Sequence, residues 1–232
     1  MSMDLPNARQ FHIHPSMVGN EAVSVPLGPL YRQMMSVLRL SKGDAVRFFD
    51  GLGTVIDGTI AHISKDAVLV RIENRAAQTH SSHLTLAIAI LKNDRMRFVL
   101  EKATELGVKE IIPLLTERVV KRPPQVPPRW NIIVKEAAEQ SGRAWLPAIA
   151  PVQTLEHVLE RPERRLLMST RAVTALENPD RNEAIVIIGP EGGFTEQELA
   201  AAEAHGASLL SLGPYQFRAD TAAIVALARL GT

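Results

Sequence analysis

A strand-like run of apolar residues that ends in a glycine-rich loop is the feature of the sequence most suited to binding chemistry. Residues 185–188 are all apolar, and Gly189-Pro190-Glu191-Gly192-Gly193 follows them directly. In open α/β sheets ligands bind at the carboxyl ends of strands, and glycines there let the main chain approach a ligand closely. The pattern predicts a binding loop at 188–194. A strand-to-helix turn without a ligand would have the same pattern.

The spacing of the glycines indicates which ligands suit this loop. It is neither Gly-x-Gly-x-x-Gly nor Gly-x-x-x-x-Gly-Lys-Ser/Thr, the two arrangements that cradle phosphates, and no lysine follows it. A ligand without phosphate groups, such as an adenosine that carries an amino acid, is therefore the more natural expectation.

A second loop of the same kind lies at 212–221, where a glycine and a proline again follow an apolar run and precede a helix. If the two loops follow adjacent strands, they form one cleft into which Arg218, Asp220 and Thr221 bring donors and acceptors. The alternative for Arg218 is a surface ion pair with Asp220, and exposed pairs contribute little to stability.

Several other kinds of site are not expected. The chain has no cysteine, which excludes disulfides, thiolate metal sites and a cysteine nucleophile. Its seven histidines have no carboxylate partners at ligand spacing, so no metal is expected. No Gly-x-Ser-x-Gly nucleophile elbow is present.

Positive charge is local in this sequence. The net charge is only +1, but Arg118, Lys121, Arg122 and Arg129 lie in one stretch without an acidic residue. Such a stretch either contacts nucleic-acid phosphates or is a solvated, proline-rich loop. No apolar run approaches the ~20 residues of a membrane helix, and the first residues lack the order of a signal peptide, so a cytoplasmic protein without a membrane partner is expected.

Two regions of different periodicity must position these residues. Up to about residue 75, short strands at 46–49, 54–63 and 67–72 surround one helix at 30–38. Closely spaced short strands predict a small β-barrel. A polar linker is expected at 74–82.

From residue 84 onward strands alternate with helices, which predicts an α/β domain with a largely parallel sheet. Thr195 and Glu198 form a capping box that starts one helix, and Asp94 is expected to cap another. The strands are expected at 84–91, 110–115, 165–168, 185–188 and 208–212. The helices are expected at 94–106, 130–141, 195–205 and 222–230.

Several motifs in register resemble one family. They are residues 188–194 and 212–221, the stretches 96–108 and 136–143, Thr116-Glu117-Arg118, and Val37-Leu38-Arg39 with Gly43-Asp44 and Phe49-Asp50-Gly51. Together they resemble the RsmE family of the SPOUT superfamily, which methylates N3 of uracil in 16S ribosomal RNA. The resemblance covers nearly the whole chain in the family's order.

The resemblance implies a fold in two parts. Residues 1–75 would be a PUA-like β-barrel that binds RNA, and 76–232 a SPOUT α/β methyltransferase domain in which about 165–232 thread a trefoil knot. The knot would form the pocket for S-adenosyl-L-methionine, and SPOUT enzymes are typically homodimers. The substrate would be 16S rRNA of the small ribosomal subunit, at uracil 1498 in the family.

The resemblance also implies site residues. The cofactor would contact three strand ends and the loops after them, at Leu167, Met168, Gly189, Pro190, Glu191, Gly192, Gly193, Leu212, Gly213, Phe217 and Thr221. In the family's Leu-Gly-Pro-Arg-Ile-Leu-Arg-Thr-Glu-Thr-Ala motif, Tyr215, Ala219 and Asp220 replace the first arginine, the threonine and the glutamate.

Methylation at N3 of uracil requires loss of the N3 proton, and negative charge then develops on the ring oxygens. Arg218 is the first candidate for a cation that stabilises this charge, and Asp220 is a weaker candidate for the base. RNA phosphates would be bound by Arg9, Arg32, Arg39, Arg118, Lys121, Arg122 and Arg143, of which Arg143 could instead act from the partner subunit. Two alternatives stay open: a non-catalytic RNA-binding protein that retains the fold, and an α/β enzyme for a different nucleotide.

Overall fold

The computed structural model describes residues 9–79, 82–120, 122–176 and 182–231, and it divides into two compact units. Residues up to 80 form the first unit together with 138–146, and 81–137 with 147–232 form the second. The segment 138–146 therefore joins the first unit although it lies within the second unit in sequence.

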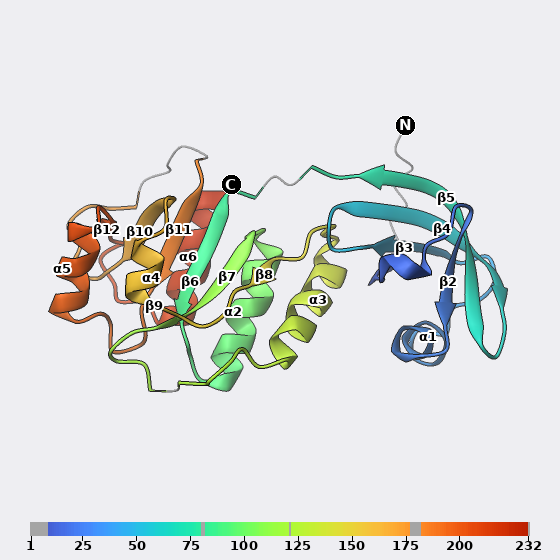
Figure 1. Cartoon of the computed structure of the whole chain (residues 1–232), viewed down its shortest axis with the longest axis horizontal. Helices are drawn as coiled ribbons and strands as arrows, with labels where there is room; N and C mark the ends of the chain where they lie inside the picture. Colours follow the sequence, from blue (N-terminus) through green and yellow to red (C-terminus); the bar gives the residue numbers. More distant parts are fainter. Residues whose placement is uncertain (1–8, 80–81, 121, 177–181, 232) are drawn as a thin grey trace. The chain divides into compact units, whose positions relative to one another are not determined.

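The first unit is a curled sheet of five strands in the order β1-β3-β4-β5-β2. The strands are β1 (Arg9–His12), β2 (Ala22–Pro26), β3 (Ala45–Phe49), β4 (Thr54–Ile63) and β5 (Ala67–Ala77). β1 and β3 run parallel, and the other neighbours run antiparallel. Every strand contributes to one apolar core around Phe11, Phe48 and Met34. Figure 1 shows β4 and β5 bending along their length.

Three parts of this sheet were not predicted. β1 buries only Phe11 well, so it has no hydrophobic period. β2 does alternate buried and exposed residues, but it is only five residues long and was not expected. β5 runs to Ala77, so the predicted linker at 74–82 is wrong for its first residues. These residues pair with the start of β4 through main-chain hydrogen bonds, which leave no hydrophobic pattern in the sequence.

The helix predicted at 30–38 is built from two short pieces. α1 (Pro29–Arg32) continues into a π-helical turn, η2 (Gln33–Val37), and Met34 is buried beneath it. Arg39 follows with a φ of 54°, in the left-handed region that favours glycine. A 3-10 turn, η1 (Pro15–Met17), lies between β1 and β2.

The segment 138–146 packs on the hairpin turn between β3 and β4. Leu146 N donates to Gly51 O at 3.0 Å, and Gly53 N donates to Ala144 O at 3.1 Å. The Trp145 ring lies against Gly53, where an added Cβ would be 2.4 Å from a ring carbon. Glycine is required at this turn because both the φ of 100° and the ring's approach exclude a side chain.

The second unit is a seven-stranded parallel sheet, as predicted for an α/β domain, with the order β12-β10-β11-β6-β7-β8 and β9 also paired to β7. The strands are β6 (Leu84–Ala89), β7 (Glu110–Leu115), β8 (Ala148–Ile149), β9 (Gln153–Thr154), β10 (Arg164–Met168), β11 (Ala184–Ile188) and β12 (Ser208–Leu210). β6 and β11 are buried along their whole length, which is typical of central strands covered on both faces.

Helices cover both faces of this sheet (Figure 1). The helices after residue 80 are α2 (Asn93–Glu105), α3 (Arg129–Ser141), α4 (Leu155–Leu159), α5 (Glu196–Ala204) and α6 (Ala219–Gly231), and α3 ends within the segment 138–146 of the first unit. α4 and α5 pack on Ile185 and Ile187. α6 contacts β6, β11 and α2, and side chains alternate along a strand, so α6 lies on the other face. The short elements β8, β9 and α4 were not predicted.

The two predicted helix caps had different outcomes. The Thr195 hydroxyl accepts from Glu198 N, and the Glu198 carboxylate accepts from Thr195 N, so this capping box is confirmed. The Asp94 cap is wrong: Lys92 is the N-cap of α2 and makes no side-chain cap hydrogen bond. Asp94 lies in the first turn, where its charge still interacts favourably with the helix dipole.

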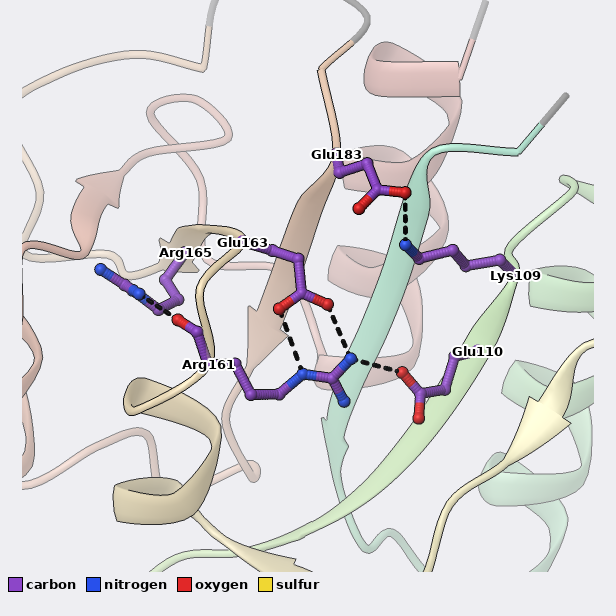
Figure 2. Close-up of polar contacts among 6 residues, drawn as sticks. All are labelled: Lys109, Glu110, Arg161, Glu163, Arg165 and Glu183. Atoms are coloured by element: carbon purple, nitrogen blue, oxygen red, sulfur yellow. Dashed lines mark hydrogen bonds and ion pairs between the residues drawn. The ribbon is translucent and has the colours of Figure 1, made fainter.

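An ion-pair network joins the amino ends of the parallel strands (Figure 2). Arg161, between α4 and β10, bonds Glu163 at 2.7 Å and Glu110 at 2.9 Å. Lys109 bonds Glu183 at 2.9 Å nearby. Glu110 begins β7 and Glu163 immediately precedes β10, so Arg161 links two strands that are not neighbours.

We expect this network to make stability depend on pH. The hydrogen bond from Arg161 lowers the pKa of Glu163 below its ordinary value of 4.5. A carboxylate with a lowered folded pKa stabilises the fold above its unfolded pKa, and this stabilisation is lost as pH falls through the folded value. The free energy of unfolding should therefore fall less steeply below about pH 4.5 in Glu163→Gln than in the unchanged protein.

Denaturant unfolding at several pH values measures this dependence. Glu183→Gln is the matched control, because the Glu183 side chain is 65% exposed and its pair with Lys109 should contribute little. Parallel pH curves for Glu163→Gln and the unchanged protein would contradict the expectation.

Candidate active site

Three loops meet at the carboxyl edge of the parallel sheet. They follow β10, β11 and β12, and they enclose a pocket of about 480 Å³, within the range of small-molecule sites. The two glycine loops do not follow adjacent strands, because β10 lies between β11 and β12. They nevertheless share one pocket, since the loop after β10 completes its wall.

The loop after β11 is a tight turn with fixed geometry. Gly193 N donates to Pro190 O at 2.8 Å, and Gly193 has a φ of 68°. The buried Phe194 ring folds back on Gly189, where an added Cβ would lie 2.8 Å from the ring. The glycines at both ends of the turn therefore have a steric cause in this fold.

Two arginines from distant parts of the second unit hold this loop. Arg95 Nη1, on α2, lies 2.6 Å from Glu191 Oε1. Arg118 Nη1, past the end of β7, donates to Gly192 O at 2.6 Å and lines the pocket. The contact of Arg95 was missed by sequence reasoning, since no local pattern relates residues so far apart in sequence.

The loop after β12 is less tightly held and places polar groups at the pocket. Gly213 has a φ of 139°, and its N–H donates to Ser211 Oγ at 3.3 Å. Tyr215 and Arg218 line the pocket with exposed side chains. The Arg218 carbonyl accepts from Ala222 N at 2.8 Å, and this bond starts α6.

The alternative reading of Arg218 as half of a surface ion pair does not hold. No ion pair joins Arg218 to Asp220 in the part of the chain that the structure describes. The Asp220 carboxylate instead accepts from the neighbouring Thr221 N at 2.9 Å. Arg218 thus lines the pocket without an ion pair to Asp220.

The structure brings together most of the predicted cofactor residues. Those that line the pocket are Met168, Gly189, Pro190, Glu191, Gly192, Gly193, Leu212, Gly213 and Phe217. Leu167 is fully buried within β10, and Thr221 and Asp220 lie in the first turn of α6 outside the lining. Ser169, Thr170 and Arg171 also line the pocket and were missed. Their position, as polar residues directly after a buried strand, was the available signal.

The predicted RNA-binding residues fall in both units. Arg9, Arg32 and Arg39 are exposed on the first unit. Arg143 also belongs to the first unit, and burial lowers the pKa of its guanidinium. Arg122, like Arg118, is engaged within the second unit, donating to Thr116 O at 2.9 Å.

The remaining expectations concern Lys121, metal binding and membrane helices. Lys121 lies outside the described residues. Over the described ranges, no three histidine, aspartate or glutamate side chains gather in a way that would hold a metal ion. No helix within those ranges is long and apolar enough to cross a membrane.

Comparison with known proteins identifies the family. The profile of the RNA methyltransferase domain matches residues 78–231, and that of the RNA methyltransferase PUA domain matches residues 34–73. Ribosomal RNA small subunit methyltransferase E of Synechocystis is 33% identical over 94% of this chain and 75% of its own length. The Rickettsia conorii protein of the same name is 31% identical, over 95% and 94% respectively. The chain belongs to the ribosomal RNA small subunit methyltransferase E family.

A solved methyltransferase E supports the same assignment in three dimensions. The Neisseria gonorrhoeae enzyme, whose crystal structure is bound to S-adenosyl methionine, superposes with a TM-score of 0.85 at 30% identity, covering 96% of both chains. The predicted resemblance is therefore confirmed, as are a PUA domain within the first unit and an α/β RNA methyltransferase domain that follows it.

Proposed function

We propose that this protein transfers a methyl group from S-adenosyl-L-methionine to N3 of a uracil in 16S rRNA of the small ribosomal subunit. The observation that carries the proposal is the pocket formed by the loops after β10, β11 and β12. Its loop after β11 has no phosphate motif, and a methyltransferase E with the same fold is solved with S-adenosyl methionine. The protein would act in the cytoplasm, where ribosomal RNA is assembled into subunits.

The proposed methyl transfer is a single displacement at the methyl carbon. The N3 proton of uracil leaves to a base, the N3 lone pair attacks the sulfonium methyl carbon, and the carbon–sulfur bond breaks to release S-adenosylhomocysteine. Because the displacement is in line, the protein mainly positions the two reactants. The Arg218 guanidinium at the pocket would stabilise the negative charge that develops on the uracil oxygens. Asp220 as the base stays a prediction.

We also propose a separate role for each of the two parts of the chain. Residues 1–75 would bind RNA, which would present an unpaired or flipped uracil to the pocket within 76–232.

Family membership further predicts a trefoil knot formed by about 165–232 and a homodimer. Light scattering in solution tests the dimer, and a monomeric mass would contradict it.

Two measurements test the function. Isothermal titration should show binding of S-adenosyl-L-methionine, and absence of binding would overturn the methyltransferase proposal. Labelled methyl should then pass to small subunits from a strain that lacks the modification, and nucleoside mass spectrometry should find it at N3 of uridine. Cofactor binding without transfer would instead favour the non-catalytic RNA-binding protein.

The backbone of Arg39 supports its place in RNA binding. A non-glycine residue in the left-handed region costs about 1–2 kcal/mol, and such strain is often retained for function. Both Arg39→Gly and Arg39→Ala should lower RNA affinity and reduce its salt dependence by about one phosphate contact. Arg39→Gly should be the more stable of the two by about 1 kcal/mol, because only glycine adopts a φ of 54° without strain.

RNA filter binding at several salt concentrations, together with denaturant unfolding, measures both parts of this prediction. If both variants bind RNA as tightly as the unchanged protein, the proposed contact of Arg39 with phosphate is wrong.

A further inference from the structure

The side chain of Arg118 makes two kinds of contact with one glycine. Its Nη1 donates to Gly192 O at 2.6 Å, across 74 positions of sequence. Its methylene stem lies over the Gly192 Cα, where an added Cβ would be 3.3 Å from Arg118 Cδ and 3.5 Å from Arg118 Cβ. The hydrogen bond fixes the direction of the Gly192 carbonyl, and the stem limits the space in which that residue can move.

The main chain beside Arg118 is itself anchored to the far end of the same loop. Glu117 N donates to Glu198 Oε1 at 2.8 Å. The other carboxylate oxygen, Glu198 Oε2, accepts from Thr195 N at 2.8 Å in the capping box of α5. One carboxylate therefore caps α5 and holds the segment that carries Arg118.

The side chain of Arg122 also holds the main chain at residues 116 and 117. Arg122 Nη2 donates to Thr116 O at 2.9 Å and to Glu117 O at 3.2 Å. We call Thr116-Glu117-Arg118 the β7 exit segment, since it follows β7 directly. The β7 exit segment thus contacts the glycine loop at Gly192 and, through Glu198, at the start of α5.

We infer that Arg118 is a positioning residue that holds the glycine loop in its cofactor-binding conformation, rather than a ligand of RNA phosphate. The inference deepens the proposed function and rests on it for the identity of the cofactor. A preformed loop binds more tightly because less conformational freedom is lost on binding. A guanidinium that donates to a carbonyl within the pocket wall is directed at the protein's own main chain.

The first test needs no cofactor. Hydrogen–deuterium exchange of the amides at 189–194 should be faster in Arg118→Ala than in the unchanged protein, with both measured free of ligand. Arg229→Ala is the matched control, because it removes one exposed arginine from the last turn of α6, at the end of that helix remote from the pocket. Equal exchange in Arg118→Ala and the control would overturn the inference.

The second test separates the two roles of Arg118. Loss of the loop's support should weaken binding of S-adenosyl-L-methionine about tenfold or more, which is the usual effect of a lost hydrogen bond from a charged group. RNA affinity and its salt dependence should stay unchanged. The reverse result, in which the salt slope falls by about one and cofactor affinity is kept, would make Arg118 a phosphate ligand and overturn the inference.

A double-mutant cycle supplies a readout that a general loss of stability would not produce. Gly192→Ala should weaken cofactor binding in the unchanged background, because the new Cβ meets the Arg118 stem. In the Arg118→Ala background the stem is absent, so the same change should cost less. Additive effects would overturn the inference. If the unchanged protein does not bind S-adenosyl-L-methionine at all, the proposed function fails, and the exchange experiment alone then decides whether Arg118 holds the loop.

Discussion

Arg218→Ala is expected to slow methyl transfer by about 10²–10³-fold while leaving the affinity for S-adenosyl-L-methionine unchanged. Arg218 lines the pocket and has no ion pair with Asp220 among the described residues, so we expect its guanidinium to be available to a developing oxyanion. Its removal should not disturb α6, because Arg218 starts that helix through its carbonyl, which alanine retains. Single-turnover transfer to small subunits measures the rate, and isothermal titration measures the affinity.

The matched variant for this prediction is Arg218→Lys. Lysine keeps the positive charge but presents a point charge in place of a planar pair of donors, so the rate should lie between those of the other two proteins. A normal rate in Arg218→Ala would remove Arg218 from the mechanism. If Arg218→Ala instead lost its affinity for S-adenosyl-L-methionine along with its transfer rate, Arg218 would be a cofactor-binding residue.

Gly53→Ala is expected to lower the free energy of unfolding of the first unit by about 2–4 kcal/mol. Its φ of 100° strains any other residue, and an added Cβ would lie 2.4 Å from a Trp145 ring carbon and 2.9 Å from Gln78 O. Trp145 has little room to withdraw, because its Nε1 donates to the same Gln78 carbonyl at 3.0 Å. Denaturant unfolding followed by tryptophan fluorescence measures the loss.

Gly43→Ala separates the two causes of this loss. Gly43 has a φ of 96°, nearly that of Gly53, but no atom lies within 4 Å of its added Cβ. Its substitution should therefore cost only the backbone strain, about 1 kcal/mol. Equal losses in the two variants would show that the contact with Trp145 contributes nothing.

The parts of the fold that were predictable are those set by neighbours in sequence. β4 and β7 have the predicted bounds because turn residues end their apolar runs, and the Thr195 capping box needs only a residue three positions away. Strand order was not predictable in this way. The place of β10 between β11 and β12 depends on contacts among segments far apart in the chain, which no local period encodes.

In the candidate site, too, only the features with a local cause were predictable from the sequence. The glycine loops were visible in sequence because glycine after a buried strand has a local steric cause. The partners of those loops could not be predicted. The hydrogen bond from the Arg118 guanidinium to Gly192 O joins residues 74 positions apart, and no local pattern relates them. A cluster of basic residues can be recognised in the sequence, but the partner of each side chain depends on the fold.

The segment 138–146 has a consequence for the order in which this protein matures during synthesis. The turn at 50–53 receives its partners Ala144, Trp145 and Leu146 only after the ribosome has made more than ninety further residues. Until then Gly53 faces no indole, and the first unit lacks part of its own interior. The amino-terminal unit therefore cannot finish folding before β6, α2 and β7 have been translated, so the two units mature as interleaved halves of one chain.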